Sequence, residues 1–422
     1  MAQLKAHSLT GRITPSLMLK AFKAVKKNRG AHGIDKVSIK MFEHERDQNL
    51  AALMKDLKHR DYWPLPLRRE YIPKAPGKLR PLGIPAVRDR VAQEVIRQLI
   101  EPYFEPHFAE RSFGFRPRRN CHQAVRELLR LRKLGYRIIL DADIQSFFDN
   151  IPHALIMKLV AENIADGNIL STIQKFLTSG VMEDGVLKKT HLGTPQGGVI
   201  SPLLANIVLD VLDKELASFG YIFVRYADDF LVLAKSLAEI EKALVLVRNV
   251  IEVKLQLKLS PEKTKITSFR EGFDFLGFHF SHNGVTMRAK SVEKLKDNFR
   301  NLTTRSHNFS GEVIEKINRV TRGAANYYAT EFSTTKTQFF KLDQMIRRRL
   351  RCMKKKRISG NDNRIPNRYF ERRGLLALYA FAAPASQPKN NNRFPQKFRG
   401  NVKRAARQAA LGVARCKKDA RR

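Results

Sequence analysis

Four aspartates lie in or beside runs of aliphatic residues, and they limit what this chain can fold into more than any other feature. The segment RIILDADI places Asp141 and Asp143 at the end of one aliphatic run, and FVRYADDFLVL places Asp228 and Asp229 between two others. Short aliphatic runs of this kind are typical of buried strands. A buried carboxylate needs a partner, so these acids must either reach solvent in a turn or face a cation.

Two readings of the aspartates are open at this point. An Asp-Asp pair in a tight hairpin would simply expose both carboxylates. The alternative is a metal site, and the charge of the chain favours it. With 79 Lys and Arg against 40 Asp and Glu, the formal net charge is +39, which indicates a polyanionic partner. Clustered carboxylates in a basic protein are what two Mg²⁺ ions at a phosphoryl-transfer site require, since Mg²⁺ prefers oxygen ligands.

Composition bounds the class of protein. At roughly 150 residues per domain, a chain of 422 residues predicts two or three domains. Hydrophobic residues make up 43% and charged residues 28%, which indicates a globular body. Cys121, Cys352 and Cys416 form no CxxC pair, so neither a disulfide framework nor a cysteine zinc site is expected. The N-terminal sequence has no signal-peptide pattern and no window is apolar enough for a membrane span, so we expect a cytoplasmic protein with no membrane partner.

The hydrophobic pattern predicts an α+β fold. Helical spacing dominates up to about residue 60, and two apolar runs around a Pro-Gly turn at 71–85 predict a hairpin. Further helices are expected at 88–109, 121–135, 152–179 and 236–256, and strands at 137–144 and 222–234. Short strands with an Asn-Gly turn follow at 273–287. Beyond about residue 290 the pattern is helical and basic.

Six short motifs then carry a family resemblance. YADD at 226–229 resembles the metal-binding hairpin of reverse transcriptases, and five further motifs are similar to the block series of group II intron-encoded reverse transcriptases: RPLGIP at 80–85, SFGFRPRRN at 112–120, ADIQSFFDNI at 142–151, GTPQGGVISPLLANI at 193–207 and FLGF at 275–278. The resemblance covers roughly residues 15–375. It implies a right-hand polymerase, with fingers and palm over 1–290 and an antiparallel palm sheet, a helical thumb or maturase-like region over 291–380 and a basic flexible tail over 381–422.

The same resemblance implies the metal ligands and the general acid. Asp143, Asp228 and Asp229 would hold two Mg²⁺ ions, with the carbonyl of Ile144 as an auxiliary ligand, while Asp141 is interpreted as a strand-end residue. A cation near the leaving group assists release of pyrophosphate. Either of two lysines in SPEKTKI could serve as that general acid, Lys263 or Lys265.

Further residues would bind the nucleotide and the primer. Phe148 matches the position that packs under the incoming sugar and excludes a 2′-OH, which makes dNTPs the expected substrates. Arg80 would grip the triphosphate with Lys74 or Lys78 nearby, supported by Arg116. The PQGG loop would back the nucleotide through Gln196 and let the backbone approach the primer-template at Gly197 and Gly198. The primer-grip hairpin, FLGF, would contain Phe275, Leu276 and Gly277, and the side chains of Phe275, Leu276 and Phe278 could equally belong to the core.

The segment IRRRLRCMKKKR is expected to be an RNA-phosphate surface. Eight basic residues within 346–357 on one helix repel one another unless a polyanion screens them; they are Arg347, Arg348, Arg349, Arg351, Lys354, Lys355, Lys356 and Arg357. In the neighbouring segment VTRGAANYYATEF, Ala324 stands where the family pattern usually has Trp.

Three functions are compatible with these motifs. The first is an RNA-directed DNA polymerase that copies a bound structured noncoding RNA into cDNA from a DNA primer, in antiphage defence. The second is an intron-encoded reverse transcriptase and maturase that acts in splicing and retrotransposition. The third is a catalytically inactive RNA-binding splicing factor. Ala324 and the absence of an endonuclease module beyond residue 375 favour the first, and the intact aspartates argue against the third. Nothing in the pattern points to an oligomeric state.

Overall fold

A computed structural model describes residues 5–75, 77–183, 185–188, 192–194, 197–356 and 365–382. The chain divides into two compact units, Met1–Thr267 and Ser268–Arg422. Two predicted site residues, Gln196 and Arg357, lie outside the described residues. For Lys74 and Lys78 only the backbone is described. The predicted tail lies outside them from residue 383 onward. The predicted functional boundary at residue 290 remains a prediction.

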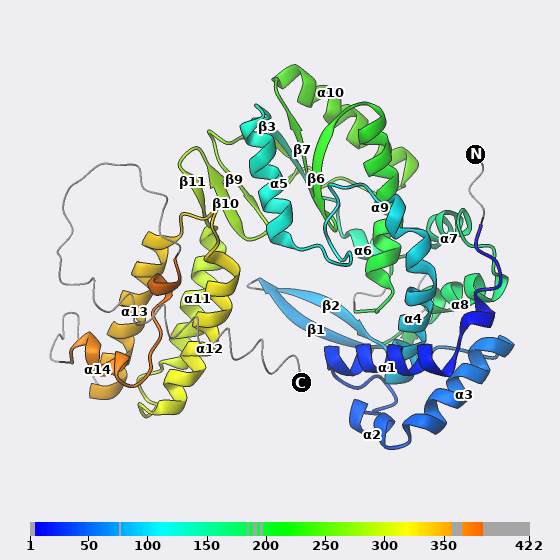
Figure 1. Ribbon diagram of the computed structural model, residues 1–422, viewed down its shortest axis with the longest axis horizontal. Coiled ribbons are helices and arrows are strands. Elements are labelled where there is room, and N and C mark those ends of the chain that lie inside the picture. Colours follow the sequence, from blue (N-terminus) through cyan, green and yellow to red (C-terminus); the bar gives the residue numbers. More distant parts are fainter. Residues whose placement is uncertain are drawn as a thin grey trace. The chain divides into compact units, whose positions relative to one another are not determined.

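The first unit is a mixture of helices and two sheets (Figure 1). Its helices are η1 (Thr10–Arg12), α1 (Pro15–Asn28), α2 (Ile39–His44), α3 (Arg46–His59), α4 (Val87–Ile100), η2 (Glu101–Tyr103), η3 (Glu105–His107), α5 (Cys121–Lys133), α6 (Phe147–Asn150), α7 (His153–Ala161), α8 (Gly167–Thr178), α9 (Ser201–Ser218), α10 (Leu237–Arg248) and η4 (Asn249–Lys254). Its strands are β1 (Leu67–Ala75), β2 (Lys78–Ile84), β3 (Ile138–Ala142), β4 (Val181–Glu183), β5 (Val186–Lys188), β6 (Ile222–Tyr226), β7 (Asp229–Ala234) and β8 (Lys265–Ser268).

The strands of this unit form two four-stranded sheets. The first has the order β2-β1-β4-β5 and contains the predicted hairpin at 71–85. The second, called the palm sheet below, has the order β6-β7-β3-β8. Within it β3 and β6 both pair antiparallel with β7. Helices α5, α9 and α10 pack against the palm sheet (Figure 1), which leaves the ends of its strands to carry polar residues.

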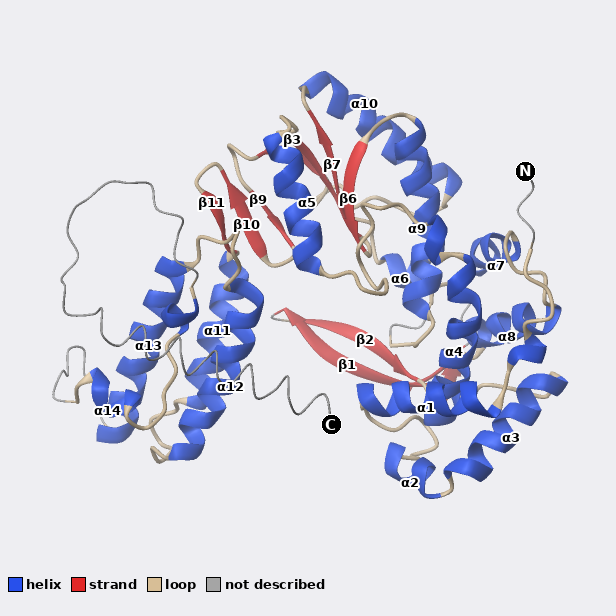
Figure 2. Ribbon diagram, viewed as in Figure 1, coloured by secondary structure: helices blue, strands red, loops and turns tan. Residues whose placement is uncertain are grey.

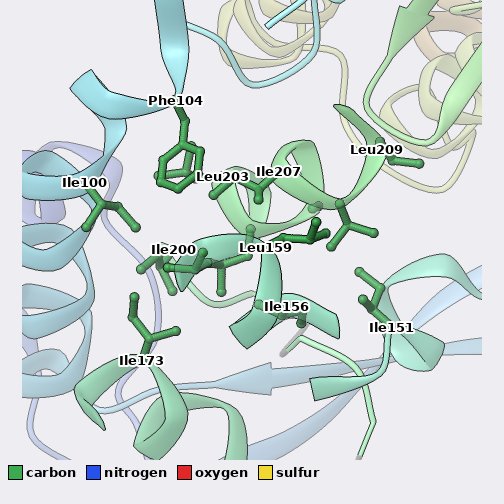
Figure 3. Close-up of a cluster of buried hydrophobic side chains, with 14 of the residues drawn as sticks. Ile100, Phe104, Ile151, Ile156, Leu159, Ile173, Ile200, Leu203, Ile207 and Leu209 are labelled. Carbon is green, nitrogen blue, oxygen red and sulfur yellow. The ribbon is translucent and has the colours of Figure 1, made fainter. Parts of the chain in front are cut away.

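One hydrophobic core supports this arrangement. Side chains from α4, α7, α8 and α9 interlock in it (Figure 3), and many of them are fully buried, including Ile100, Ile156, Ile173 and Leu209. The inward residues of the palm strands, such as Leu140 and Val232, belong to the same cluster. The palm sheet is therefore anchored to the helical part of its unit rather than resting on it loosely.

The second unit combines a small sheet with helices (Figure 2). Strands β9 (Phe273–Phe275), β10 (Phe278–Ser281) and β11 (Gly284–Met287) form an antiparallel sheet in the order β11-β10-β9. The helices are α11 (Ala289–Leu302), α12 (Gly311–Tyr328), α13 (Lys336–Lys355), α14 (Asn367–Glu371) and η5 (Leu378–Phe381). Their own core contains Phe299, Ile317, Phe339 and Leu342, all within 1% of full burial, and Ala324 packs there too.

The α+β fold and most of the predicted elements are confirmed, with corrections that have local causes. The helix predicted over 88–109 ends at Ile100 because Pro102 and Pro106 cannot continue it, and short 3-10 turns follow. The helix predicted over 152–179 is two helices, since the side chain of Asp166 caps a new helix at Gly167. The β4–β5 hairpin was not predicted because strands of three residues carry almost no periodic signal. No helix in the described part of the chain is long and apolar enough to cross a bilayer.

A buried carboxyl group joins α4 to the segment before β1. Asp89, only 1% exposed, accepts hydrogen bonds from the Tyr62 hydroxyl (2.7 Å) and the Leu65 N–H (3.0 Å). Burial raises the pKa of Asp89 to about 6, against the hydrogen bonds that lower it. An unfolded chain would titrate Asp89 near its ordinary value of about 3.9. The folded chain therefore holds one proton more than the unfolded chain between about pH 4 and pH 6.

This difference predicts how stability depends on pH. The contribution of Asp89 to the free energy of unfolding should fall as the pH rises from about 4 to about 6, by at most ~1.4 kcal/mol per pH unit, and then level off. Asp89→Asn keeps an acceptor for Tyr62 but has no proton to lose. Urea unfolding at pH 4, 5, 6 and 7, followed by the fluorescence of the single tryptophan, Trp63, should show a shallower fall for the variant than for the wild type. Identical pH slopes for the two proteins would contradict the assignment.

Candidate active site

The predicted metal-binding aspartates come together at one end of the palm sheet. Asp143 directly follows β3, and Asp229 is the first residue of β7. Ala142 of β3 pairs with Phe230 of β7, so the register continued by one residue sets Asp143 beside Asp229. Asp228 precedes β7 in the turn from β6. Because paired strands lie about 4.8 Å apart, segments distant in sequence meet here.

The YADD motif forms a two-residue hairpin turn. Tyr226 pairs with Asp229, which leaves Ala227 and Asp228 as the turn. Ala227 is left-handed, with φ of +57°, at the first turn position, where hairpins with one such residue favour glycine. The hairpin alternative raised by the sequence is thus correct for the backbone. A simple hairpin turn would expose both aspartates; Asp229 is exposed, whereas Asp228 is half-buried.

Electrostatics link Asp228 to three predicted site residues. Burial raises the pKa of Asp228 above its ordinary value, and the negative charge of Asp143 raises it further. The positive charges of Arg80 and Lys263 act in the opposite direction. Two carboxylates and two cations from four separate segments therefore act on one another at this end of the sheet. Asp141, in contrast, lies within β3 opposite Leu231.

Lys263 is held against Asp143. Its Nζ donates to Asp143 Oδ2 at 2.8 Å, and its side chain remains 60% exposed. The same segment is tied by its backbone, since the Ser260 N–H donates to the Asp143 carbonyl at 2.8 Å. Ile144, the predicted auxiliary ligand, forms a β-bridge with Leu259, and its side chain is buried. Of the two candidate lysines, the structure thus brings Lys263 to the aspartates, whereas Lys265 begins β8 with an exposed side chain.

Phe148 lies in α6, five residues after Asp143. Its half-buried ring packs edge-on against Phe147, with 5.4 Å between ring centroids. The Phe148 carbonyl accepts a hydrogen bond of 2.7 Å from the Thr194 N–H, which attaches the GTPQGG loop to α6. Gly193 enables this contact: its φ is +85°, and a Cβ there would lie 2.8 Å from the Phe148 carbonyl oxygen.

The other end of that loop touches the β1–β2 hairpin. Gly197 has φ of +117°, and a Cβ would lie 2.7 Å from the Gly83 carbonyl oxygen of β2. The close backbone approach that the structure shows for Gly197 is therefore to β2. Arg80 lies on the same strand, paired with Ile72, and its side chain is exposed. Lys74 belongs to β1.

Arg116 has a supporting position inside the protein. Its guanidinium, 4% exposed, pairs with Glu105 at 3.0 Å and donates to the carbonyls of Ala109 (2.6 Å) and Ser112 (2.9 Å). These bonds fold the SFGFRPRRN motif back on the 3-10 turn before it. The adjacent Gly114 then meets the YADD turn so closely that a Cβ would lie 2.2 Å from the Ala227 nitrogen. Sequence patterns carried no sign of this approach, because the glycine and the alanine are ordinary when each is considered separately.

The predicted primer grip is a tight hairpin in the second unit. Leu276 and Gly277 form the turn between β9 and β10, with φ of +47° and +81°. Phe275 is buried. The Leu276 carbonyl accepts a hydrogen bond of 2.9 Å from the Tyr327 hydroxyl of α12, which holds the turn in place. Phe275 therefore belongs to the buried core, as one of the two interpretations of the sequence expected. The binding of a primer by this turn remains a prediction.

Several residues of the predicted RNA surface are bound within their own unit. Arg349 donates to Thr303 Oγ1 at 2.7 Å, and Arg351 donates to the Ile365 carbonyl at 2.8 Å. Lys356 donates to two carbonyls of the loop after α11, at 3.1 and 2.7 Å. These three cations hold the ends of neighbouring segments, so the sequence overestimated how many charges of α13 are available to a partner.

The remaining members of the set are distributed around the end of α13. The side chains of Arg348 and Lys354 are exposed, and those of Arg347 and Lys355 are half-buried. The ammonium of Lys354 also lies 5.0 Å from the centre of the Tyr369 ring. Arg348 is thus the member of the arginine run with the most open side chain, beside the partly open Arg347.

The donor set fits magnesium, although the described residues contain no group of three or more His, Cys, Asp or Glu side chains arranged as a metal cluster. Polymerase-type Mg²⁺ sites use one or two carboxylates together with substrate phosphates and water, rather than an all-protein cage. Asp143 and Asp228 provide two carboxylates that act on each other electrostatically. A cation between them would relieve the repulsion that raises the pKa of Asp228.

Comparison with known proteins identifies the family. Residues 72–280 match the family described as reverse transcriptase (RNA-dependent DNA polymerase), and residues 292–370 match the maturase-specific domain of group II introns. The protein YkfC of Escherichia coli (strain K12) is 35% identical over 331 residues, which cover 69% of this chain and 86% of YkfC. The chain belongs to the reverse transcriptases of group II intron type.

Two further similarities were found. The group II intron-encoded protein LtrA of Lactococcus lactis subsp. cremoris is 31% identical over 354 residues, or 67% of this chain and 58% of LtrA. Among solved structures, a chain of a partial Cas6-RT-Cas1–Cas2 complex is 23% identical with a TM-score of 0.38, and the match covers 58% of this chain and 42% of that one. The right-hand polymerase fold and the assignment to the RNA-directed DNA polymerases are confirmed for this reverse transcriptase. Its chain spans little more than half of LtrA.

Proposed function

We propose that this reverse transcriptase adds dNTPs to the 3′ end of a primer on an RNA template by a two-metal mechanism. The observation that supports the proposal is the meeting of Asp143 and Asp228 at one end of the palm sheet, with the charges of Arg80 and Lys263 acting on the same carboxylate. Two acids and two cations in one place suit a reaction in which a polyanionic triphosphate must be held and cleaved.

Asp143 and Asp228 are the proposed principal metal ligands, with Asp229 beside them and the Ile144 carbonyl as an auxiliary ligand. Two Mg²⁺ ions bound there would neutralise the triphosphate and favour ionisation of the primer hydroxyl. The protein positions the reactants: the palm sheet fixes the backbone of all three acids, and no covalent intermediate with a side chain is needed. The exposed Arg80 on β2 binds the phosphates of the incoming nucleotide, with Lys74 nearby on β1.

Lys263 is the proposed general acid. Its ammonium group donates to Asp143 at 2.8 Å, so a proton donor is already held beside a metal ligand. If Asp143 bound a metal ion, this ammonium would be available to protonate the oxygen of the leaving pyrophosphate. The exposed side chain allows that movement, since 60% of it faces solvent.

Selection of the sugar is assigned to Phe148, and support of the base to Gln196 with Gly197. The ring of Phe148 packs edge-on against Phe147, and the Thr194 N–H holds the backbone of Phe148, so this ring is the proposed barrier to a 2′-OH. Phe275, Leu276 and Gly277 are the proposed primer grip, in which the Tyr327 hydroxyl holds the turn.

The end of α13 is the proposed RNA interface of the second unit. Arg347, Arg348, Lys354 and Lys355 supply the charge that can meet phosphates, while Arg349, Arg351 and Lys356 brace the segments around them. Arg357 completes the predicted set. Contacts of this kind bind the RNA backbone and carry no sequence information themselves.

Substitution of a proposed metal ligand tests the mechanism. Asp228→Asn and Asp229→Asn should each lower the rate of DNA synthesis on a primed RNA template by at least about 10²-fold, because an amide cannot balance the charge of a cation. RNA affinity, measured by filter binding, should stay within about twofold of the wild type.

The matched control for the aspartate variants is Asp61→Asn, an exposed aspartate in the turn after α3. It should synthesise DNA at the wild-type rate. Full synthesis by Asp228→Asn would refute the metal assignment and with it the proposed function.

A second test addresses the RNA interface. Arg347→Ala combined with Arg348→Ala should weaken RNA binding and flatten its dependence on salt, by about 0.7–0.9 in the logarithmic slope for each phosphate that is no longer neutralised. Arg349 is left in place because its removal would release Thr303. Arg322→Ala on α12, whose partner is the exposed Glu315, is the control for a general decrease in positive charge. An unchanged slope in the double variant would remove the end of α13 from the interface.

Two biological roles share this chemistry. In the first, the enzyme copies a structured noncoding RNA that it binds, in antiphage defence, as the alanine at position 324 in place of Trp suggests. In the second, it is the reverse transcriptase and maturase of a mobile intron. The match to the maturase-specific domain over residues 292–370 favours this second role.

Sequencing the RNA that co-purifies with the protein separates the two roles. For the defence role, we expect one short noncoding RNA in large excess over cellular RNA. Ligated exons or an intron lariat would instead establish the maturase role and exclude the first.

A further inference from the structure

A fully buried ion pair lies directly beneath the YADD turn. Arg225, the residue before the motif, is 0% exposed, and so is Asp213 of α9. The contact is bidentate, with Arg225 Nε donating to Asp213 Oδ1 at 2.8 Å and Nη2 donating to Oδ2 at 2.5 Å. The third guanidinium nitrogen, Nη1, donates to Asn206 Oδ1 at 2.9 Å and to the Ala227 carbonyl at 3.1 Å.

Stability of the fold alone does not explain such a pair. Taking two charges out of water is so unfavourable that a buried ion pair is often no more stabilising than apolar side chains of similar size. This pair differs from a simple salt bridge because one guanidinium nitrogen also donates a hydrogen bond to a backbone carbonyl of the YADD turn. Asp213 and Asn206 lie seven residues apart, on one face of α9, and together orient the guanidinium.

The carbonyl that Arg225 holds belongs to the strained residue of the turn. Ala227 is left-handed, a conformation that is unfavourable for a residue with a side chain and persists only when its surroundings enforce it. Arg225 holds the turn from the side of α9. Removal of this hydrogen bond would free Ala227 to leave the left-handed region and would shift Asp228, the next residue.

Gly114 lies against the same turn. Its missing side chain lets its backbone lie against Ala227, where a Cβ would be 2.2 Å from the nitrogen. Asn206 connects Gly114 to the ion pair, since its Nδ2 donates to the Gly114 carbonyl at 2.9 Å and its Oδ1 accepts from Arg225. The strand before the turn is fixed as well, because the Arg225 carbonyl accepts from the Phe113 N–H at 2.8 Å.

We propose that Arg225, oriented by Asp213 and Asn206, is a positioning residue for DNA synthesis: it holds Ala227 left-handed and thereby sets the place of the Asp228 carboxylate. The proposal rests on the proposed function of Asp228. Arg225 does not touch the substrate. Its removal should therefore lower kcat, which depends on the geometry of the carboxylates, and should leave the KM for dNTPs nearly unchanged, because Arg80 and Phe148 are unaffected.

The decisive variant removes both charges together. Arg225→Met with Asp213→Leu leaves no lone charge in the interior, so the fold should keep a near-native unfolding midpoint. The left-handed turn no longer has its hydrogen bond, and we expect kcat to fall by about tenfold to a hundredfold, the range that misplacement by about 1 Å produces. If the pair served stability alone, the folded double variant would have the wild-type kcat, and that result overturns the proposal.

Gly114→Ala is the second variant and perturbs the turn without touching any charge. The added methyl group must displace Ala227, so kcat should fall again with KM for dNTPs within about twofold of the wild type. Two controls make the same substitutions away from the turn. Gly323→Ala adds a methyl group where a Cβ has open space. Arg88→Met with Asp56→Leu removes a partly exposed ion pair between α4 and α3. Both controls should keep the wild-type kcat. A wild-type kcat in folded Gly114→Ala also overturns the proposal.

The wild type and Asp228→Asn are measured in the same assay. Equal rates for these two proteins would refute the proposed function itself. If they differ as expected while either the folded double variant or folded Gly114→Ala works at the wild-type rate, only the positioning role of Arg225 is refuted.

Discussion

The antiparallel pairing of β3 with β7 is the constraint on which the rest of the site depends. It is a backbone interaction between two strands that are far apart in the sequence, and it places Asp143 next to the YADD turn. The neighbouring segments are attached to this pair. Ser260 and Leu259 bond to the backbone around Asp143, which brings Lys263 into position. A shift of register by one residue would turn every side chain of one strand to the other face and separate the carboxylates.

Opposing effects act on the pKa of Asp228, one of the proposed metal ligands. The chain has a formal net charge of +39, yet its proposed reaction centre is acidic. Burial raises the pKa of Asp228 and the negative charge of Asp143 raises it further, whereas the positive charges of Arg80 and Lys263 lower it. This arrangement suits the proposed two-metal reaction, in which oxygen ligands would bind the metal ions and surrounding cations would bind the phosphates. Deeper in the protein, the Arg225–Asp213 pair uses two buried charges to hold backbone instead of substrate.

Much of this could be predicted from the sequence, because alternating and continuous apolar runs define strands and the aspartates interrupt them visibly. The β6–β7 hairpin and the position of Asp143 at the end of β3 follow from such local patterns. The approach of Gly114 to Ala227 could not be predicted, since it joins two segments through the absence of a side chain. The number of basic residues on α13 also led to too large a predicted RNA surface. A sequence shows how many charges a helix has, but not that Arg349 and Arg351 donate to carbonyls of their own unit.

Asp143 and Asp228, from two separate segments, are the proposed ligands of two metal ions. Crystals of the full chain with a primer-template, a non-hydrolysable dNTP analogue and Mn²⁺ in place of Mg²⁺ test it directly through the anomalous scattering of manganese. This metal assignment predicts two peaks about 3.5–4 Å apart, each in contact with an oxygen of Asp143 or Asp228. Manganese bound elsewhere, or the two carboxylates separated by more than about 10 Å in that complex, too far to share ions spaced in this way, would contradict it.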